Sequence, residues 1–212
     1  MKYYSQIGQD QYYIENIANE KRNGIFLDIG ANNGIFESNT ATLEFDYGWE
    51  GICIEANPKL IGELTANRPK SKIVQCAVWH SNGEIEFETT NSNLRGIQGH
   101  LLSRISNLEN NNQYFNEHFE ENKSTFVVDT RTVTDILKEY YEFPCTIDYC
   151  SIDTEGAELE SLHGIDFDQI DIKFLTIEHG CRPNYIEKFE NYLTPQGYKI
   201  HRINQWDVEF IK

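Results

Sequence analysis

Residues 26–34 read FLDIGANNG, and residues 51–55 read GICIE. Each stretch is a short apolar run that ends on a polar or glycine-rich turn, which is typical of a buried strand in a parallel sheet. The first run leads into Gly30 and Gly34, and the second ends on Glu55. In open α/β sheets, ligands bind at the carboxyl ends of the strands. These two strands therefore predict a ligand site at the turns that follow them.

The spacing of the two glycines narrows the type of ligand. It is G-x-x-x-G, whereas dinucleotide-binding proteins use G-x-G-x-x-G. Asn32 stands where such a protein needs a second glycine to admit the pyrophosphate. The sequence thus favours a nucleoside without a diphosphate, and NAD-linked redox chemistry is the alternative. Glu55 is placed to accept hydrogen bonds from the ribose hydroxyls.

Asp28 lies near the end of the first predicted strand. A buried carboxylate is costly unless it is paired. A ligand with an α-amino group would compensate it, and a helix N-terminus would do so too. S-adenosylmethionine combines adenosine with an amino acid, so it fits both Asp28 and Glu55.

The remaining chain alternates between strand and helix patterns. Strands are expected at 25–29, 51–55, 72–78, 84–89, 126–129, 147–152 and 173–177, and helices at 40–47, 58–68, 133–141, 157–163 and 184–193. The last two strands, 198–203 and 208–211, have no helix between them and should pair antiparallel at one edge. This order predicts a doubly wound, mostly parallel α/β sheet with a terminal antiparallel hairpin. Because every block fits one sheet, a single domain over residues 1–212 is expected.

Residues 91–123 interrupt this pattern. They are rich in Asn, Ser and Glu and lack a clear period, apart from a short helix expected at 113–121. A long irregular segment inside a compact domain often acts as a lid or a binding segment. Its polar and basic side chains would grip a polyhydroxylated acceptor; they are Arg95, Gln98, His100, Arg104 and His118.

Composition excludes several classes of partner. The chain has 18 Lys+Arg against 34 Asp+Glu, a net charge of −16, which argues against nucleic acid and against an anionic membrane surface. No apolar run is long enough to span a bilayer, and no secretory signal is readable. The five cysteines form no C-x-x-C pair, so reduced thiols and a cytoplasmic location are expected. The oligomeric state is not indicated.

A second group of polar residues follows two later strands. Residues 152–156 read IDTEG, and residues 176–180 read TIEHG. Neighbouring strands lie about 4.8 Å apart, so acids at the ends of these two would converge at the edge that carries the glycine turn. The predicted catalytic residues are Asp153, Glu155, Glu178 and His179.

Two roles are open for this second group. His179 is one candidate general base because its ordinary pKa lies near neutrality, and Asp153 is the rival. Asp153 and Glu178 also supply oxygen ligands of the kind that Mg²⁺ or another divalent metal takes.

Several blocks of the sequence resemble the FkbM family of S-adenosylmethionine-dependent methyltransferases. They are FLDIGANNG, ESNT at 37–40, GWEGICIEANP at 48–58 and YCSIDTEGAELESLHGI at 149–165, with SQIGQD at 5–10 ahead of the first strand. The resemblance implies the class I methyltransferase fold, a Rossmann-like sheet of seven strands. It also implies methylation of a hydroxyl, commonly of a sugar in a glycan or glycoconjugate. A non-sugar natural product as acceptor, and a non-catalytic nucleotide-binding subunit of the same fold, are the alternatives.

The resemblance and the positions at strand ends together give a set of cofactor-binding residues. They are Gln9, Asp10, Asp28, Gly30, Ala31, Asn32, Asn39, Glu55, Ala56, Cys76, Ala77 and Asp153. Asn39 is in addition a candidate helix N-cap. Since so many acids fall at strand ends, a neutral small-molecule or glycan acceptor is expected rather than an anionic one.

Overall fold

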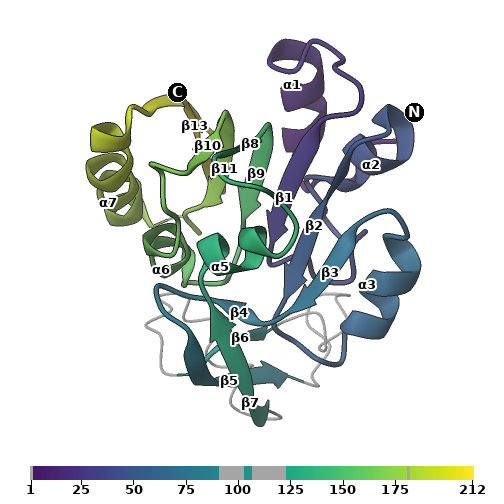
Figure 1. Cartoon of the computed structure of the whole chain (residues 1–212), viewed down its shortest axis with the longest axis vertical. Helices are drawn as coiled ribbons and strands as arrows, with labels where there is room; N and C mark the ends of the chain where they lie inside the picture. Colours follow the sequence, from purple (N-terminus) through teal and green to yellow (C-terminus); the bar gives the residue numbers. More distant parts are fainter. Residues whose placement is uncertain (1, 91–102, 107–122, 181) are drawn as a thin grey trace.

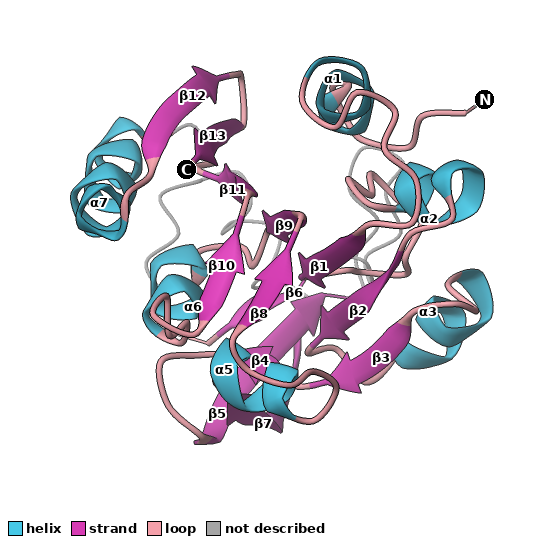
Figure 2. Cartoon of the chain, turned by 45° about the horizontal axis from the view of Figure 1, so that its top comes forward, coloured by secondary structure: helices cyan, strands magenta, loops and turns pink. Residues whose placement is uncertain are grey.

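The computed structural model describes residues 2–90, 103–106, 123–180 and 182–212. Its centre is a sheet in the order β12-β13-β11-β9-β1-β2-β3 (Figures 1 and 2). The strands are β1 (Ile25–Ile29), β2 (Glu50–Glu55), β3 (Lys72–Gln75), β9 (Tyr149–Ile152), β11 (Phe174–Glu178), β12 (Lys199–Ile203) and β13 (Asp207–Ile211). In this sheet β13 runs antiparallel to both of its neighbours, β11 and β12, and the other pairs of strands are parallel. The predicted α/β class, with a mostly parallel seven-stranded sheet and a terminal hairpin, is confirmed.

Helices cover both faces of this sheet (Figure 2). One face packs against α1 (Gln9–Asn16), α2 (Ala41–Tyr47) and α3 (Ile61–Asn67), and the other against α5 (Val133–Lys138), α6 (Glu158–His163) and α7 (Pro183–Leu193), which the short 3₁₀ turn η2 (Thr194–Gln196) follows. The α1 helix was not predicted, because its sequence QDQYYIEN buries only two apolar side chains. No helix within the described ranges is long and apolar enough to cross a bilayer.

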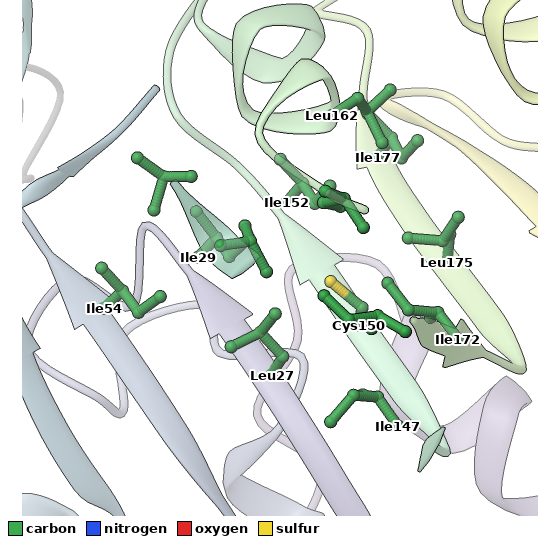
Figure 3. Packing of buried hydrophobic residues seen from close by; sticks show 14 of the residues in the cluster. Leu27, Ile29, Ile54, Ile147, Cys150, Ile152, Leu162, Ile172, Leu175 and Ile177 are labelled. Atoms are coloured by element: carbon green, nitrogen blue, oxygen red, sulfur yellow. The ribbon is translucent and has the colours of Figure 1, made fainter. Parts of the chain in front are cut away.

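The two core clusters follow from the alternation of side chains along the strands. On β1, Leu27 and Ile29 are buried in the cluster that includes Leu162 of α6, as Figure 3 shows for these side chains. Phe26 points the other way and packs in the cluster that includes Leu43 of α2. A strand buried on both faces must be apolar throughout, which is why Asp28 is exceptional in β1.

The expectation that all blocks join one sheet is wrong. The predicted strand at 72–78 breaks at Cys76, and β4 (Ala77–Val78) turns into a second sheet with the order β4-β7-β5-β6. The other strands of that sheet are β5 (Gly83–Thr90), β6 (Ser103–Ile105) and β7 (Lys123–Arg131). This second sheet lies beyond the arrowheads of β1 and β2 (Figure 1), so it covers the edge where ligands bind in such folds.

The predicted strand at 147–152 is also divided. Cys145–Ile147 is β8, which pairs with β10 (Ile170–Ile172) in a separate two-stranded sheet, and β9 begins after Asp148. The Asp148 side chain accepts a hydrogen bond from the Ile25 backbone N–H at 2.9 Å and forms an ion pair with Lys21 at 2.6 Å. These contacts fix the start of β1 to Asp148, the residue that separates β8 from β9. The apolar pattern of the sequence does not reveal this interruption.

The predicted lid at 91–123 falls mostly outside the described residues, and so does the helix expected at 113–121. In its described part, β6 pairs antiparallel with β5. There Arg104 lies within 2.6 Å of the Glu88 carboxylate, and both side chains are buried. Arg104 therefore forms an ion pair within the second sheet, and it is not among the residues that line the cavity described below.

Candidate active site

A cavity of about 320 Å³ lies at the carboxyl ends of the central strands, between them and the second sheet. Its volume falls in the range of ordinary small-molecule sites. The lining includes most of the predicted site residues, namely Asp28, Gly30, Ala31, Asn32, Asn39, Glu55, Ala56, Cys76, Ala77, Asp153, Glu155 and Glu178. Residues from both halves of the sequence thus meet in one space.

The turn after β1 requires glycine at its first position. Gly30 has a φ of +84°, and a Cβ there would lie 1.7 Å from the Asp153 carbonyl oxygen. The backbone N–H groups of Gly30 and Ala31 both donate to the Ile54 carbonyl, at 2.9 and 3.0 Å. This turn therefore packs tightly against the ends of β9 and β2, and its backbone forms part of the cavity wall.

Asn32 has a structural reason to stand where dinucleotide-binding proteins carry glycine. Its φ is +52°, a left-handed conformation that Asn adopts more readily than most residues. Its backbone N–H donates to Glu55 at 2.9 Å, and the N–H of Asn57 donates to the other Glu55 oxygen at 2.7 Å. The Glu55 carboxyl is thereby fixed between two loops at the cavity wall. Burial raises the pKa of Glu55 to about 7.

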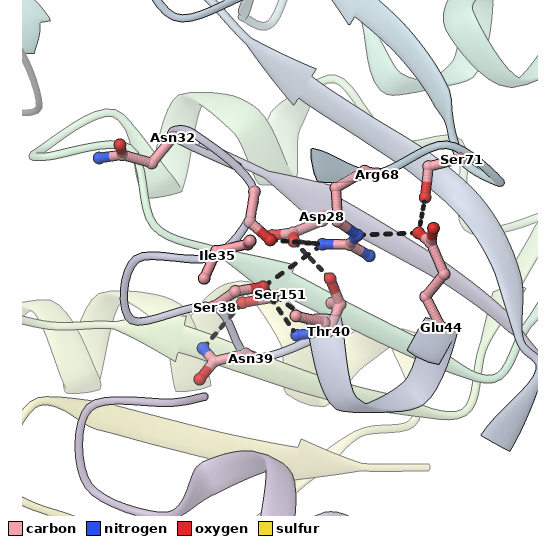
Figure 4. A network of polar contacts seen from close by, with 12 residues as sticks. Asp28, Asn32, Ile35, Ser38, Asn39, Thr40, Glu44, Arg68, Ser71 and Ser151 are labelled. Atoms are coloured by element: carbon pink, nitrogen blue, oxygen red, sulfur yellow. Dashed lines mark hydrogen bonds and ion pairs between the residues drawn. The ribbon is translucent and has the colours of Figure 1, made fainter. Parts of the chain in front are cut away.

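Asp28 already has partners within the protein (Figure 4). Its Oδ2 accepts a hydrogen bond from the Thr40 hydroxyl at 2.5 Å and lies 3.6 Å from an Arg68 nitrogen. Burial raises the pKa of Asp28, and Arg68 opposes that shift. The structure thus shows a buried arginine and a hydroxyl as partners of this carboxylate, which the sequence did not indicate, and binding of a ligand's amino group to Asp28 stays a prediction.

Arg68 supports the site from behind the cavity wall, and the sequence does not reveal this, because its position predicts only the end of a helix. The side chain is fully buried and donates from Nε to Glu44 at 2.8 Å and from Nη1 to the Gly34 carbonyl at 3.3 Å. Glu44 is equally buried and also accepts from the Ser71 hydroxyl (Figure 4). This network locks the glycine turn to α2 and to the end of α3.

Asn39 lines the cavity but does not cap the helix, so that part of its prediction is wrong. The N-cap of α2 is Thr40, and the Ser38 hydroxyl accepts from the N–H groups of Thr40 and Ala41, at 3.3 and 3.1 Å. The Asn39 amide donates to the Ser151 hydroxyl at 3.0 Å, while its Oδ1 is buried without a partner among the described residues. A buried unpaired acceptor costs about 1–3 kcal/mol. A ligand that brings a donor here would remove that cost.

Asp153 and Glu178 form a carboxyl pair in the cavity wall. The register Ile152↔Ile177 brings them side by side at the ends of β9 and β11. Burial raises the pKa of both carboxyls well above their usual range. Repulsion from neighbouring acids raises both pKa values further. A hydrogen bond between the two carboxyls lowers the pKa of Asp153. The two carboxyls therefore hold a proton between them, and the hydrogen bond favours ionisation at Asp153.

Glu155 and Glu37 line the same cavity, and both have a strained backbone conformation. Both adopt positive φ values, 54° and 51°. Such conformations are costly for residues other than glycine and gather at functional sites. Burial raises the pKa of Glu155 to about 7, and repulsion from Glu158 adds to the shift.

Three predicted site residues are not among those that line the cavity. The imidazole of His179 lies 3.4 Å from the Asn204 carbonyl. Gln9 donates to Asp207 at 2.6 Å, and Asp10 accepts from the Tyr4 N–H at 2.8 Å and from the Thr42 hydroxyl at 2.6 Å. These residues hold the terminal segments in place, and the N-terminal segment brings Gln6 to the cavity wall.

Sequence reasoning missed the walls that cover the strand ends. They include Gln6, Phe36, Glu37, Phe87, Ser103, Ile105 and Trp206. Phe87, Ser103 and Ile105 come from the second sheet, whose position no local pattern predicts. Trp206 lies in the turn between β12 and β13. The signal that could have identified it is an aromatic residue in a polar turn beside a predicted strand end.

The assignment of Asp153 and Glu178 as metal ligands stays a prediction. Within the described residues, no group of three or more His, Cys, Asp or Glu side chains is arranged to hold a metal ion. Asp153 and Glu178 share a hydrogen bond.

With this geometry in place, the family of the chain is settled by its sequence. A family model described as the methyltransferase FkbM domain matches residues 28–200. The chain belongs to the FkbM methyltransferase family. The matched region begins at Asp28 and includes the glycine turn, Glu55 and the Asp153–Glu178 pair, so most of the cavity lining lies within it, while Gln6 and Trp206 lie outside.

Solved structures support the fold of this FkbM-family chain. A methyltransferase FkbM from Methylobacillus flagellatus superposes with a TM-score of 0.54 at 14% identity, over 91% of this chain and 44% of that one. The N-terminal domain of human METTL16, in complex with SAH, gives a TM-score of 0.50 at 13% identity, over 97% and 71%. The chain thus spans less than half of that FkbM structure. No curated protein matches it in sequence.

Proposed function

We propose that this FkbM-family protein transfers the methyl group of S-adenosylmethionine to a hydroxyl of a neutral sugar, in a glycan or glycoconjugate. The observation that carries the proposal is one cavity whose lining includes both the residues expected to hold a nucleoside, such as Glu55 and Cys76, and the Asp153–Glu178 carboxyl pair. The first feature suits the methyl donor, and the second suits removal of a proton from the acceptor.

The residues of the strand ends fit the methyl donor. Glu55 offers a fixed carboxyl to the ribose hydroxyls, and Cys76 and Ala77 offer small side chains beside the adenine. The orphaned Asn39 Oδ1 would accept from the α-amino group, since Asp28 is already paired with Arg68. When bound, the sulfonium of the donor supplies an activated methyl group.

The electrostatics of the cavity favour a neutral acceptor. Six carboxyl groups belong to its lining, and no Lys or Arg does within the described residues; the six are Asp28, Glu37, Glu55, Asp153, Glu155 and Glu178. A phosphate or carboxylate on the acceptor would be repelled at short range in a site of low dielectric constant. Hydroxyl groups, in contrast, donate well to carboxylates.

Asp153 is the proposed general base. As the oxygen of the acceptor forms its bond to the methyl carbon, the bond from that carbon to sulfur breaks and the hydroxyl proton passes to Asp153. A positioned base of this kind contributes about 10²–10⁴-fold to the rate. Glu178 holds Asp153 in place by donating a hydrogen bond to it.

Transfer of isotopically labelled methyl from S-adenosylmethionine tests the proposal. The acceptors are methyl glycosides of neutral hexoses, the matching uronates and sugar phosphates, and simple phenols. We expect label on the neutral glycosides, with kcat/KM at least about tenfold above the anionic analogues, because the ionised carboxyls of the lining repel an added negative charge.

Other outcomes of this assay point to the alternatives. Transfer to phenols and not to glycosides would indicate a non-sugar natural product as the acceptor. Binding of the donor without transfer to any hydroxyl would contradict the proposal and favour a non-catalytic subunit. Binding of NAD in place of the donor would indicate redox chemistry.

A further inference from the structure

Trp206 stands at the cavity wall on a rigid turn. The turn joins β12 to β13, and the side chain of Asn204 accepts from the backbone N–H groups of Trp206 and Asp207, at 2.9 and 2.7 Å. The Asn204 N–H in turn donates to the Asp207 carbonyl at 2.9 Å. Trp206 is half-buried and lines the cavity. The ring therefore belongs to a preformed wall.

His179 fastens this turn to the end of β11. Its backbone N–H donates to the Trp206 carbonyl at 2.7 Å, and its Nε2 lies 3.4 Å from the Asn204 carbonyl. A carbonyl only accepts, so this contact is a hydrogen bond in the tautomer that carries its proton on Nε2. The side chain is only 5% exposed and is absent from the cavity lining. His179 thus contacts the turn on both sides of Gln205 and does not contact the cavity.

The pairing of β11 with β13 sets Trp206 next to the acids. Glu178 is opposite Asp207 in that register, so the neighbouring Trp206 adjoins the strand end that carries the carboxyl pair. A pyranose ring has an apolar face of C–H groups and a rim of hydroxyls. An aromatic ring beside carboxyls matches these two features, because aromatic rings bind apolar surface and carboxylates accept from hydroxyls.

We propose that Trp206 is the stacking platform for the sugar ring of the acceptor and that His179 positions it. This inference rests on the proposed function and assigns two residues to acceptor binding within it. Trp206 contacts the acceptor, whereas His179 acts only through the turn. His179, one of the two candidate bases, is therefore a positioning residue.

The test compares kinetics of wild type, Trp206→Ala, Trp206→Phe, His179→Ala and His179→Gln with neutral methyl glycosides as acceptors. We expect Trp206→Ala to raise the KM of the glycoside about tenfold while the KM of S-adenosylmethionine stays within about twofold, since one stacking contact is lost. Trp206→Phe keeps an aromatic ring, so its KM for the glycoside should lie between those of wild type and Trp206→Ala. Tyr140→Ala removes an exposed ring outside the cavity lining and serves as the matched control.

The two histidine variants separate positioning from base catalysis. Glutamine keeps a donor for the Asn204 carbonyl, so His179→Gln should stay within about threefold of wild type, while His179→Ala should raise the KM of the glycoside as Trp206→Ala does. Equal loss of kcat in both variants would identify His179 as the base and overturn the inference. An unchanged KM in Trp206→Ala would overturn it as well.

Folding and the proposed function are controlled within the same set. Titration with S-adenosylhomocysteine shows whether each variant still binds the donor product with wild-type affinity. If wild type methylates the glycosides and Trp206→Ala has an unchanged KM, only the platform is wrong. If wild type methylates none of them, the proposed sugar specificity is wrong and the platform falls with it.

Discussion

Replacing Asp153 with asparagine is expected to lower kcat by about 10²–10⁴-fold while the affinity for S-adenosylhomocysteine changes by only a few-fold. Asparagine keeps the shape of the side chain but cannot take the proton of the acceptor hydroxyl. Glu178→Gln should retain much more activity, because an amide can still donate the hydrogen bond that Glu178 gives to Asp153. The measurement is steady-state methyl transfer with calorimetric titration of each variant.

The stability of the Asp153→Asn variant provides an internal check. The pKa of Asp153 is raised in the folded protein, so its stabilising contribution is complete only below the unfolded pKa and is lost as pH rises through the folded value. Asparagine does not ionise, so the Asp153→Asn variant does not lose stability in this way as pH rises. We therefore expect Asp153→Asn to be at least as stable as wild type at pH 8, so that its inactivity does not reflect unfolding.

A matched control uses an acid far from the cavity. Asp46 is exposed on α2, and Asp46→Asn should leave both kcat and stability close to wild type. Retention of more than about a tenth of wild-type kcat in Asp153→Asn would remove Asp153 from the role of base.

Replacing Arg68 with methionine is expected to lower the free energy of unfolding by about 3–5 kcal/mol. The change leaves Asp28 and Glu44 buried without their shared cation, while most of the packing volume is kept. Chemical denaturation monitored by circular dichroism measures this loss. Lys70→Met removes an exposed positive charge two residues away and should change stability by no more than about 0.5 kcal/mol.

A double variant isolates the cause of this loss. Glu44→Gln combined with Arg68→Met removes one of the uncompensated charges, so the pair should cost less than the sum of the single substitutions. Strict additivity of the two costs, or a loss below about 1 kcal/mol in Arg68→Met, would show that the buried network does not hold the glycine turn.

The sequence was sufficient for the parts of the site that depend on strand ends. Parallel strands bring their carboxyl ends to one edge, so Asp28, Glu55 and Asp153 could be placed together from local patterns alone. The same reasoning found Glu178, because TIEHG closes a strand of the same kind.

The parts that failed depend on contacts between distant segments. Arg68 reads as an ordinary helix end, yet tertiary packing turns its side chain into the core against Asp28 and Glu44. His179 follows Glu178 directly, and alternation along an extended chain sends neighbouring side chains to opposite sides. The split at Cys76 likewise reflects where β7 lies, because β4 pairs with that distant strand.

Calorimetric titration with S-adenosylhomocysteine and with 5′-methylthioadenosine, which lacks the amino-acid group, tests the central claim that the cavity binds the methyl donor. The account predicts one site, tighter binding of S-adenosylhomocysteine, and a loss of about tenfold for that ligand alone in Asn39→Ala, because Asn39 Oδ1 accepts from the α-amino group. Asn16→Ala, an exposed asparagine on α1, should bind both ligands as wild type does. Absence of binding in wild type, or an equal loss for both ligands in Asn39→Ala, would contradict the account.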